Sequence, residues 1–282
     1  MVWNPDPFVR PPRQDIAAPP LPPRLEWVGG EAPRLERLVA TGPLLVHFFD
    51  LAQLNSVRAM PYIAAWAERY REPGLSVIGV HTARFPFTAP AGAVAAGLSR
   101  LGVEWPVAVD AERTLWRDYG CQGWPSVFVW SRGGALRWYH LGEGEYSATE
   151  AAITGALEEA GREGPWPDPV APLRPGDEPG AKVIAPTPEV FPGGAPGRPW
   201  SASGDEPALE LRYEAGGAFA AAGGRGEIAV SVDGGPPRAV EVSGPGLYEL
   251  AAHEGHGSHR LELRPAGEVE VGSIQFAPAP AG

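Results

Sequence analysis

Cysteine is almost absent from this sequence: among 282 residues there is one, Cys121. A single sulfur cannot form an internal disulfide, so a disulfide framework is excluded. Catalysis by an intramolecular dithiol is excluded as well, because that chemistry needs two thiols that exchange through a mixed disulfide. Any thiol chemistry of this chain would have to combine Cys121 with an external thiol.

Long apolar segments and basic clusters are also lacking. No stretch approaches the roughly 20 apolar residues of a membrane-spanning helix, and residues 1–27 hold no apolar core of a secretory signal peptide. We therefore expect a cytoplasmic protein with no membrane partner. The net charge is −11 and the charges are dispersed, which argues against a nucleic-acid partner, since that would need a clustered basic face.

Proline and glycine are abundant, with 34 and 37 residues, and they gather in two segments. Residues 1–24 form a predicted proline-rich arm and residues 161–199 a Pro/Gly-rich linker, because closely spaced prolines interrupt helices and sheets. These segments divide the chain into a first domain at 25–160 and a second at 200–282.

The first domain alternates between strand-like and helix-like patterns. Strands are expected at 25–28, 44–49, 75–81, 107–109, 126–130 and 136–141. Helices are expected at 32–40, 56–70, 90–101, 112–119 and 147–160, the last with Ser147 as its N-cap. Strands separated by helices, followed by a hairpin and a closing helix, predict an α/β fold in which a mixed sheet carries helices on both faces.

The second domain shows a period of two without helical segments. Strands are expected at 209–213, 227–232, 239–242, 247–250, 260–263 and 269–276, separated by glycine-containing turns. Short strands at this regular spacing predict an all-β sandwich.

Several motifs of the first domain are similar to those of the DipZ/TlpA-type thioredoxin-like (redoxin) family. They are Arg58-x-x-Pro61-Tyr62, Val77–Thr82, Trp105–Asp110, Tyr119-Gly120, Trp124-Pro125 and Gly142–Tyr146. The predicted sandwich and the segment Pro188–Phe191 also resemble the C-terminal part of DipZ-type proteins. The resemblance implies a thioredoxin-like fold with a cis peptide bond before Pro125, facing the turn that carries the redox cysteines in the family.

The family's two cysteines are replaced here by Gln53 and Ser56. Neither side chain can form a mixed disulfide, so the leading hypothesis is a redox-inactive protein without catalytic residues or cofactor. It would bind a protein or an extended peptide segment through the vestigial active-site face. The residues expected to form that contact face, beside Gln53 and Ser56, are Asp50, Arg58, Trp124, Pro125, Glu143 and Glu145.

Two alternatives remain open from the sequence. The first is a thiol oxidoreductase or antioxidant enzyme that uses Cys121 alone, although Glu143 and Glu145 are expected to raise the pKa of that thiol. The second is a ligand- or glycan-binding protein led by the sandwich. The cluster His253, His256 and His259 is a weak candidate for a metal site, and its glycine-rich surroundings favour a flexible hairpin loop instead.

Overall fold

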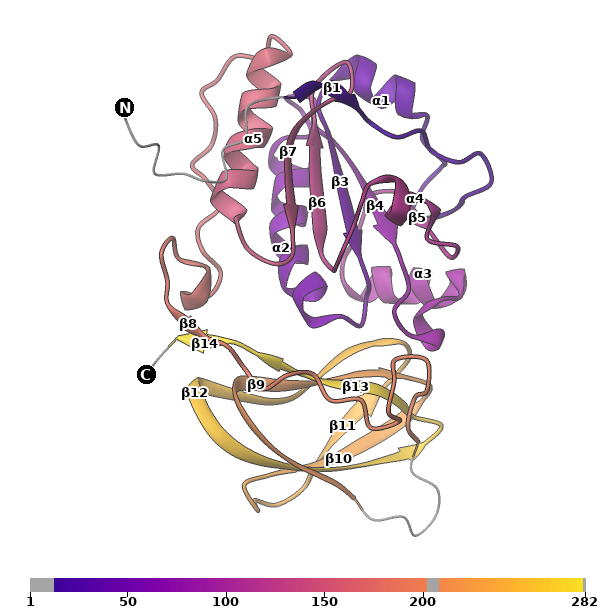
Figure 1. Cartoon of the computed structure of the whole chain (residues 1–282), viewed down its shortest axis with the longest axis vertical. Helices are drawn as coiled ribbons and strands as arrows, with labels where there is room; N and C mark the ends of the chain where they lie inside the picture. Colours follow the sequence, from indigo (N-terminus) through magenta and orange to yellow (C-terminus); the bar gives the residue numbers. More distant parts are fainter. Residues whose placement is uncertain (1–12, 202–207, 281–282) are drawn as a thin grey trace.

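A computed structural model describes residues 13–201 and 208–280 of the chain (Figure 1). An α/β domain lies above an all-β domain in this view, and an extended segment runs between them. Among the helices described, none is long and apolar enough to cross a membrane.

The α/β domain is built on a seven-stranded mixed sheet with the order β1-β7-β6-β3-β4-β5-β2. Strands β3, β4 and β5 pair in parallel, and the remaining neighbours are antiparallel. The strands are β1 (Arg13–Ala17), β2 (Glu26–Val28), β3 (Leu44–Phe49), β4 (Ser76–His81), β5 (Val107–Val109), β6 (Ser126–Trp130) and β7 (Ala135–Leu141). Strand β1 falls in the predicted arm, where it pairs with the edge of β7; residues 1–12 of the arm lie outside the described residues.

Helices cover both faces of this sheet because its central strands are apolar on both sides. In β3, Leu45 and Phe49 belong to the cluster packed by α2, α3 and α5, whereas Leu44, Val46 and Phe48 belong to the cluster packed by α1 and α4. The helices are α1 (Leu35–Thr41), α2 (Leu54–Arg69), α3 (Ala91–Arg100), α4 (Thr114–Asp118) and α5 (Tyr146–Glu159), with 3₁₀ turns η1 (Pro86–Thr88) and η2 (Pro175–Asp177).

Helix α5 begins differently from the prediction. Its N-cap is Glu145, in the left-handed conformation with φ 50°, and no side chain caps the helix. Ser147 therefore lies inside the first turn. The expected reciprocal partner, Glu150, is buried instead and accepts hydrogen bonds from Tyr70 Oη (2.8 Å) and the Val170 N–H (2.8 Å).

The all-β domain is one five-stranded antiparallel sheet with the order β11-β10-β12-β9-β13. Its strands are β9 (Leu209–Gly223), β10 (Gly226–Val232), β11 (Arg238–Val242), β12 (Gly246–Gly267) and β13 (Glu270–Ala277), and a separate two-stranded sheet pairs β8 (Val183–Ile184) with β14 (Ala279–Pro280). Residues 246–252 of β12 pair with the second half of β9, beside β13, while residues 257–263 pair with the first half, on the side of β10. Strands β9 and β12 thus each extend through both parts of the domain, the part beside β13 and the part beside β10.

Residues 247–250 and 260–263 are strand as expected, but both belong to β12, so the prediction of two separate strands with a flexible hairpin loop between them is wrong. Residues 253–256 form an irregularity inside β12, opposite the step from Ala215 to Gly217 in β9. The glycines of this segment suggested a turn, but its conformation is decided by pairing with β9.

The two domains meet where η1 and the start of α2 contact β9 and β13. The rings of Phe85 and Phe87 stack at 5.2 Å and lie against the backbone of Gly223 and Gly272. A Cβ atom placed on Gly272 would stand 2.5 Å from the Phe85 ring, so this close approach needs glycine. The β domain consequently covers the end of the sheet at which α2 begins.

Candidate functional site

The redox turn, residues 50–56, comprises the connection from β3 to α2 and the first residues of α2. It holds both positions at which the family would carry cysteine. Gln53 is the N-cap of α2, and its Oε1 accepts a hydrogen bond from the Ser56 N–H at 2.9 Å. Ser56 is fully buried, and its Oγ accepts from the Asp50 N–H at 3.3 Å. Both substituted residues thus form hydrogen bonds that fix the turn.

A residue from the other domain completes this turn. Gln275 of β13 is 3% exposed; its Oε1 accepts from the Leu54 N–H at 2.6 Å, and its Nε2 donates to the Ala52 carbonyl at 2.9 Å. The N–H groups of Leu54 and Ser56 are therefore bonded to neutral amide oxygens, at the helix N-terminus where free N–H groups would stabilise a thiolate. Gln275 was not among the predicted site residues, and its one signal in the sequence is a glutamine between the apolar residues Ile274 and Phe276.

Asp50 does not reach the surface, which corrects its assignment to the contact face. Its side chain is fully buried. Its Oδ2 accepts from the Arg84 N–H (2.9 Å) and from Thr88 Oγ1 (2.8 Å), and its Oδ1 accepts from the Ala52 N–H (2.8 Å). Carboxylates bonded in this way organise loops, so Asp50 ties the redox turn to the segment after β4.

The peptide bond between Trp124 and Pro125 is cis, as the resemblance implied. Trp124 is half-buried, and its Nε1 donates to the carbonyl of Thr82 at 3.0 Å. Pro125 is buried, and its carbonyl accepts from the Gly142 N–H at 2.8 Å. This hydrogen bond places the loop between β7 and α5 beside the cis-proline.

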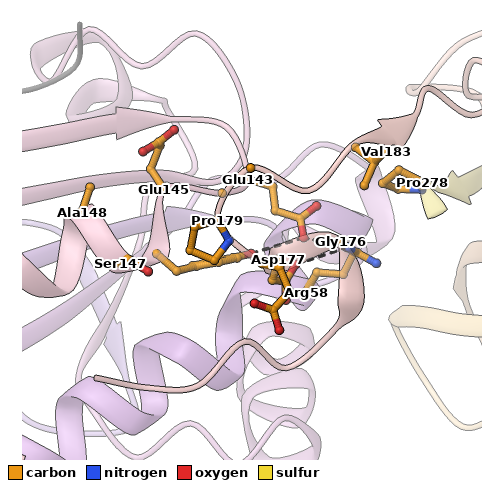
Figure 2. A pocket seen from close by; sticks show the side chains of 14 residues that line it. Arg58, Glu143, Glu145, Ser147, Ala148, Gly176, Asp177, Pro179, Val183 and Pro278 are labelled. Carbon is orange, nitrogen blue, oxygen red and sulfur yellow. Dashed lines mark hydrogen bonds and ion pairs between the residues drawn. The ribbon is translucent and has the colours of Figure 1, made fainter. Parts of the chain in front are cut away.

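Arg58 and Glu143 form the charged centre of a neighbouring pocket of about 420 Å³. Arg58 Nε lies 2.6 Å from Glu143 Oε1, and the linker adds Arg174, whose Nε lies 2.9 Å from Asp177 Oδ2. Figure 2 shows Glu143 directed toward Arg58, whereas the carboxylate of Glu145 points away from this group. Glu143 and Asp177 are thus both paired with Arg58 and Arg174 within the chain.

Cys121 lies in the core between the sheet and α4. It is 8% exposed, and burial raises the pKa of its thiol to about 12, with a further contribution from Asp110 and an opposing one from Ser126. The raised pKa agrees with the expected direction, but its main cause is burial and not Glu143 or Glu145.

Strand β12 brings His253 and His259 of the histidine cluster together, but their arrangement is not that of a metal site. The rings of His253 and His259 stack at 3.5 Å. His253 Nε2 lies 2.8 Å from Tyr213 Oη, and His259 Nδ1 lies 2.8 Å from Asp233 Oδ2. Across residues 13–201 and 208–280, no group of three His, Cys, Asp or Glu side chains is placed to hold a metal ion, His256 included.

Comparison with known proteins shows similarity along most of the chain. No family model matches it. The protein DipZ of Mycobacterium tuberculosis is 29% identical over 272 residues, which covers 83% of this chain and 38% of DipZ. The thiol-disulfide oxidoreductase YkuV of Bacillus subtilis is 25% identical over 133 residues, 47% of this chain and 88% of YkuV. The chain is a thioredoxin-like protein.

This similarity confirms the predicted redoxin family. The mixed sheet flanked by helices and the all-antiparallel β sheet of the second domain confirm the predicted α/β and all-β fold classes. The match covers most of YkuV, whereas the chain spans about two-fifths of DipZ. A solved thiol-disulfide isomerase from Corynebacterium glutamicum covers 50% of this chain and 96% of its own, with 22% identity and a TM-score of 0.45. YkuV and the Corynebacterium glutamicum protein are named for thiol–disulfide chemistry, whereas this chain has a single cysteine.

Proposed function

We propose that this thioredoxin-like protein is redox-inactive and binds an extended polypeptide segment beside Trp124 and cis-Pro125. The observation that carries the proposal is the Gln275 amide, which is hydrogen-bonded to Leu54 and Ala52 of the redox turn. The turn that performs disulfide exchange in the family is here a contact between two domains. Trp124 and Gln53 remain partly exposed at its border.

Thiol chemistry is the competing function, and it would depend on Cys121. A thiol with a pKa of about 12 is almost entirely protonated at neutral pH, and only the thiolate attacks a disulfide. Its sulfur is also largely shielded from solvent, in a side chain that is 8% exposed. Both properties oppose turnover with an external disulfide.

Polypeptide binding is favoured by what surrounds the cis-proline. Trp124 is anchored through its indole N–H at Thr82, so its ring presents a fixed apolar surface. A preorganised aromatic side chain loses little conformational entropy when a partner packs on it. Glycan binding by the β domain has less support, since its Tyr213 is buried and Trp200 packs partly into that domain's core.

Two measurements test the proposal. Insulin reduction with dithiothreitol should stay at background for the wild type and for Cys121→Ala alike, and turnover that disappears in the variant would contradict redox inactivity. A phage-displayed library of random dodecapeptides should yield enriched sequences on the wild type but not on Trp124→Ala. Trp166→Ala is the matched control, because Trp166 is also half-buried and lies in a different part of the surface. Equal enrichment on wild type and Trp124→Ala would refute binding beside the cis-proline.

A further inference from the structure

We infer that the segment bound beside Trp124 is acidic and carries an apolar residue next to its carboxylates. This inference rests on the proposed function and adds the chemistry of the partner. It is based on a surface formed by Arg84, Arg113, Trp116 and Trp124, called the Trp–Arg surface below. These residues come from the segment after β4, the start of α4 and the cis-proline loop.

The two tryptophans supply the apolar part of the Trp–Arg surface. Their ring centroids lie 4.5 Å apart with an angle of 38° between the rings, and both residues are half-buried. Tryptophan and arginine are the residue types that most often dominate the energy of protein interfaces, because they combine a large apolar area with directional polar groups. A partner side chain packed on this pair would be removed from water on one face.

The two arginines place positive charge over the same ring. The guanidinium carbons of Arg84 and Arg113 lie 5.8 Å and 5.4 Å from the Trp124 ring centroid. Arg84 is paired with Glu189 at 2.5 Å. Arg113 is exposed, and among the described residues it has no carboxylate partner; its Nη2 donates to the carbonyl of Ala83 at 2.9 Å.

The guanidinium of Arg113 is held by a hydrogen bond although, among the described residues, it has no carboxylate partner. Arg113 adopts φ 55° and ψ 35° as the N-cap of α4, and arginine in this left-handed region is uncommon. Its hydrogen bond to Ala83 holds the side chain across the gap to the segment after β4. A guanidinium held in place loses less entropy on pairing with a carboxylate than a free one.

Charge complementarity selects an acidic partner. The chain carries a net charge of −11, so an acidic segment is repelled by the molecule as a whole and is attracted to Arg113, because Arg84 is already paired with Glu189. Opposite charge at a binding site raises the rate of encounter and fixes orientation more than it adds to affinity. We therefore expect binding that weakens markedly as salt increases.

The experiment uses the full chain and one dodecapeptide taken from the selection described above. Its affinity is measured by fluorescence anisotropy for wild type, Arg113→Asn and Arg113→Lys. Asparagine is chosen because it tolerates the left-handed backbone. Arg212→Asn, at an exposed arginine of β9, is the matched control. The probes are the selected peptide, the same peptide with Asp and Glu changed to Asn and Gln, and a dodecamer of thymidylate.

Enriched peptides should contain Asp or Glu beside an apolar residue. We expect Arg113→Asn to weaken binding about tenfold, Arg113→Lys less, and Arg212→Asn not at all. Neutral or basic enriched peptides that still require Trp124 would overturn the inference and leave the proposed function standing. Preference for the thymidylate oligomer would overturn it in favour of single-stranded nucleic acid. No enrichment above Trp124→Ala would refute the proposed function, and the inference with it.

Discussion

Replacement of Gln275 by alanine tests whether the redox turn depends on the second domain. In the wild type the Gln275 side chain satisfies the Leu54 N–H and the Ala52 carbonyl, and both residues are buried. A buried backbone group left without a partner costs about 1–3 kcal/mol. Because water can enter the space vacated by the side chain, we expect a total loss of about 2–4 kcal/mol for the variant.

The loss should be concentrated at the start of α2. Native-state hydrogen exchange of the Leu54 amide reports it directly, and a change of 2–4 kcal/mol corresponds to exchange about 30 to 900 times faster. Ser273→Ala is the control, because it removes a single 3.1 Å hydrogen bond to Gln275 and leaves both backbone bonds in place. The reasoning is refuted if the Leu54 amide exchanges equally fast in the wild type and in Gln275→Ala.

Three further predictions concern buried and substituted groups. Burial lowers the pKa of His47 from 6.5 to about 3, so the folded state takes up fewer protons than the unfolded state, and stability falls as the pH drops below about 6.5. We expect about 2 kcal/mol of this loss between pH 7 and pH 5, and His47→Phe should lack it when urea midpoints are compared at the two values. Cys121 should react with iodoacetamide at pH 8 about a thousandfold more slowly in the native than in the urea-unfolded chain, because burial raises its pKa to about 12; rates within tenfold of each other would contradict this. Gln53→Cys together with Ser56→Cys should give weak insulin reduction that rises several-fold when Gln275→Ala is added, since the Gln275 amide occupies the Leu54 N–H at the start of α2; equal rates for the double and triple variants would show that Gln275 does not limit the restored pair.

Local sequence was sufficient to predict the elements whose patterns are apolar over their whole length. The strands at 44–49, 107–109 and 126–130 lie at the expected residues, because continuous apolar runs are stable only when both faces are covered. The cis bond before Pro125 followed from the family resemblance, since only proline makes that isomer inexpensive. The loss of the dithiol could be predicted from the residues at positions 53 and 56 alone.

The sequence alone thus determined the fold class and the absence of dithiol chemistry, whereas tertiary structure decided what the redox turn became. Leu54 and Gln275 are 221 residues apart, and no local pattern encodes which distant side chain will bond to a given backbone group. The burial of Asp50 and the continuity of β12 were likewise fixed by partners on other elements. Short-range periodicity determines how a segment folds, but hydrogen bonds and packing between distant segments determine which surface remains available for function.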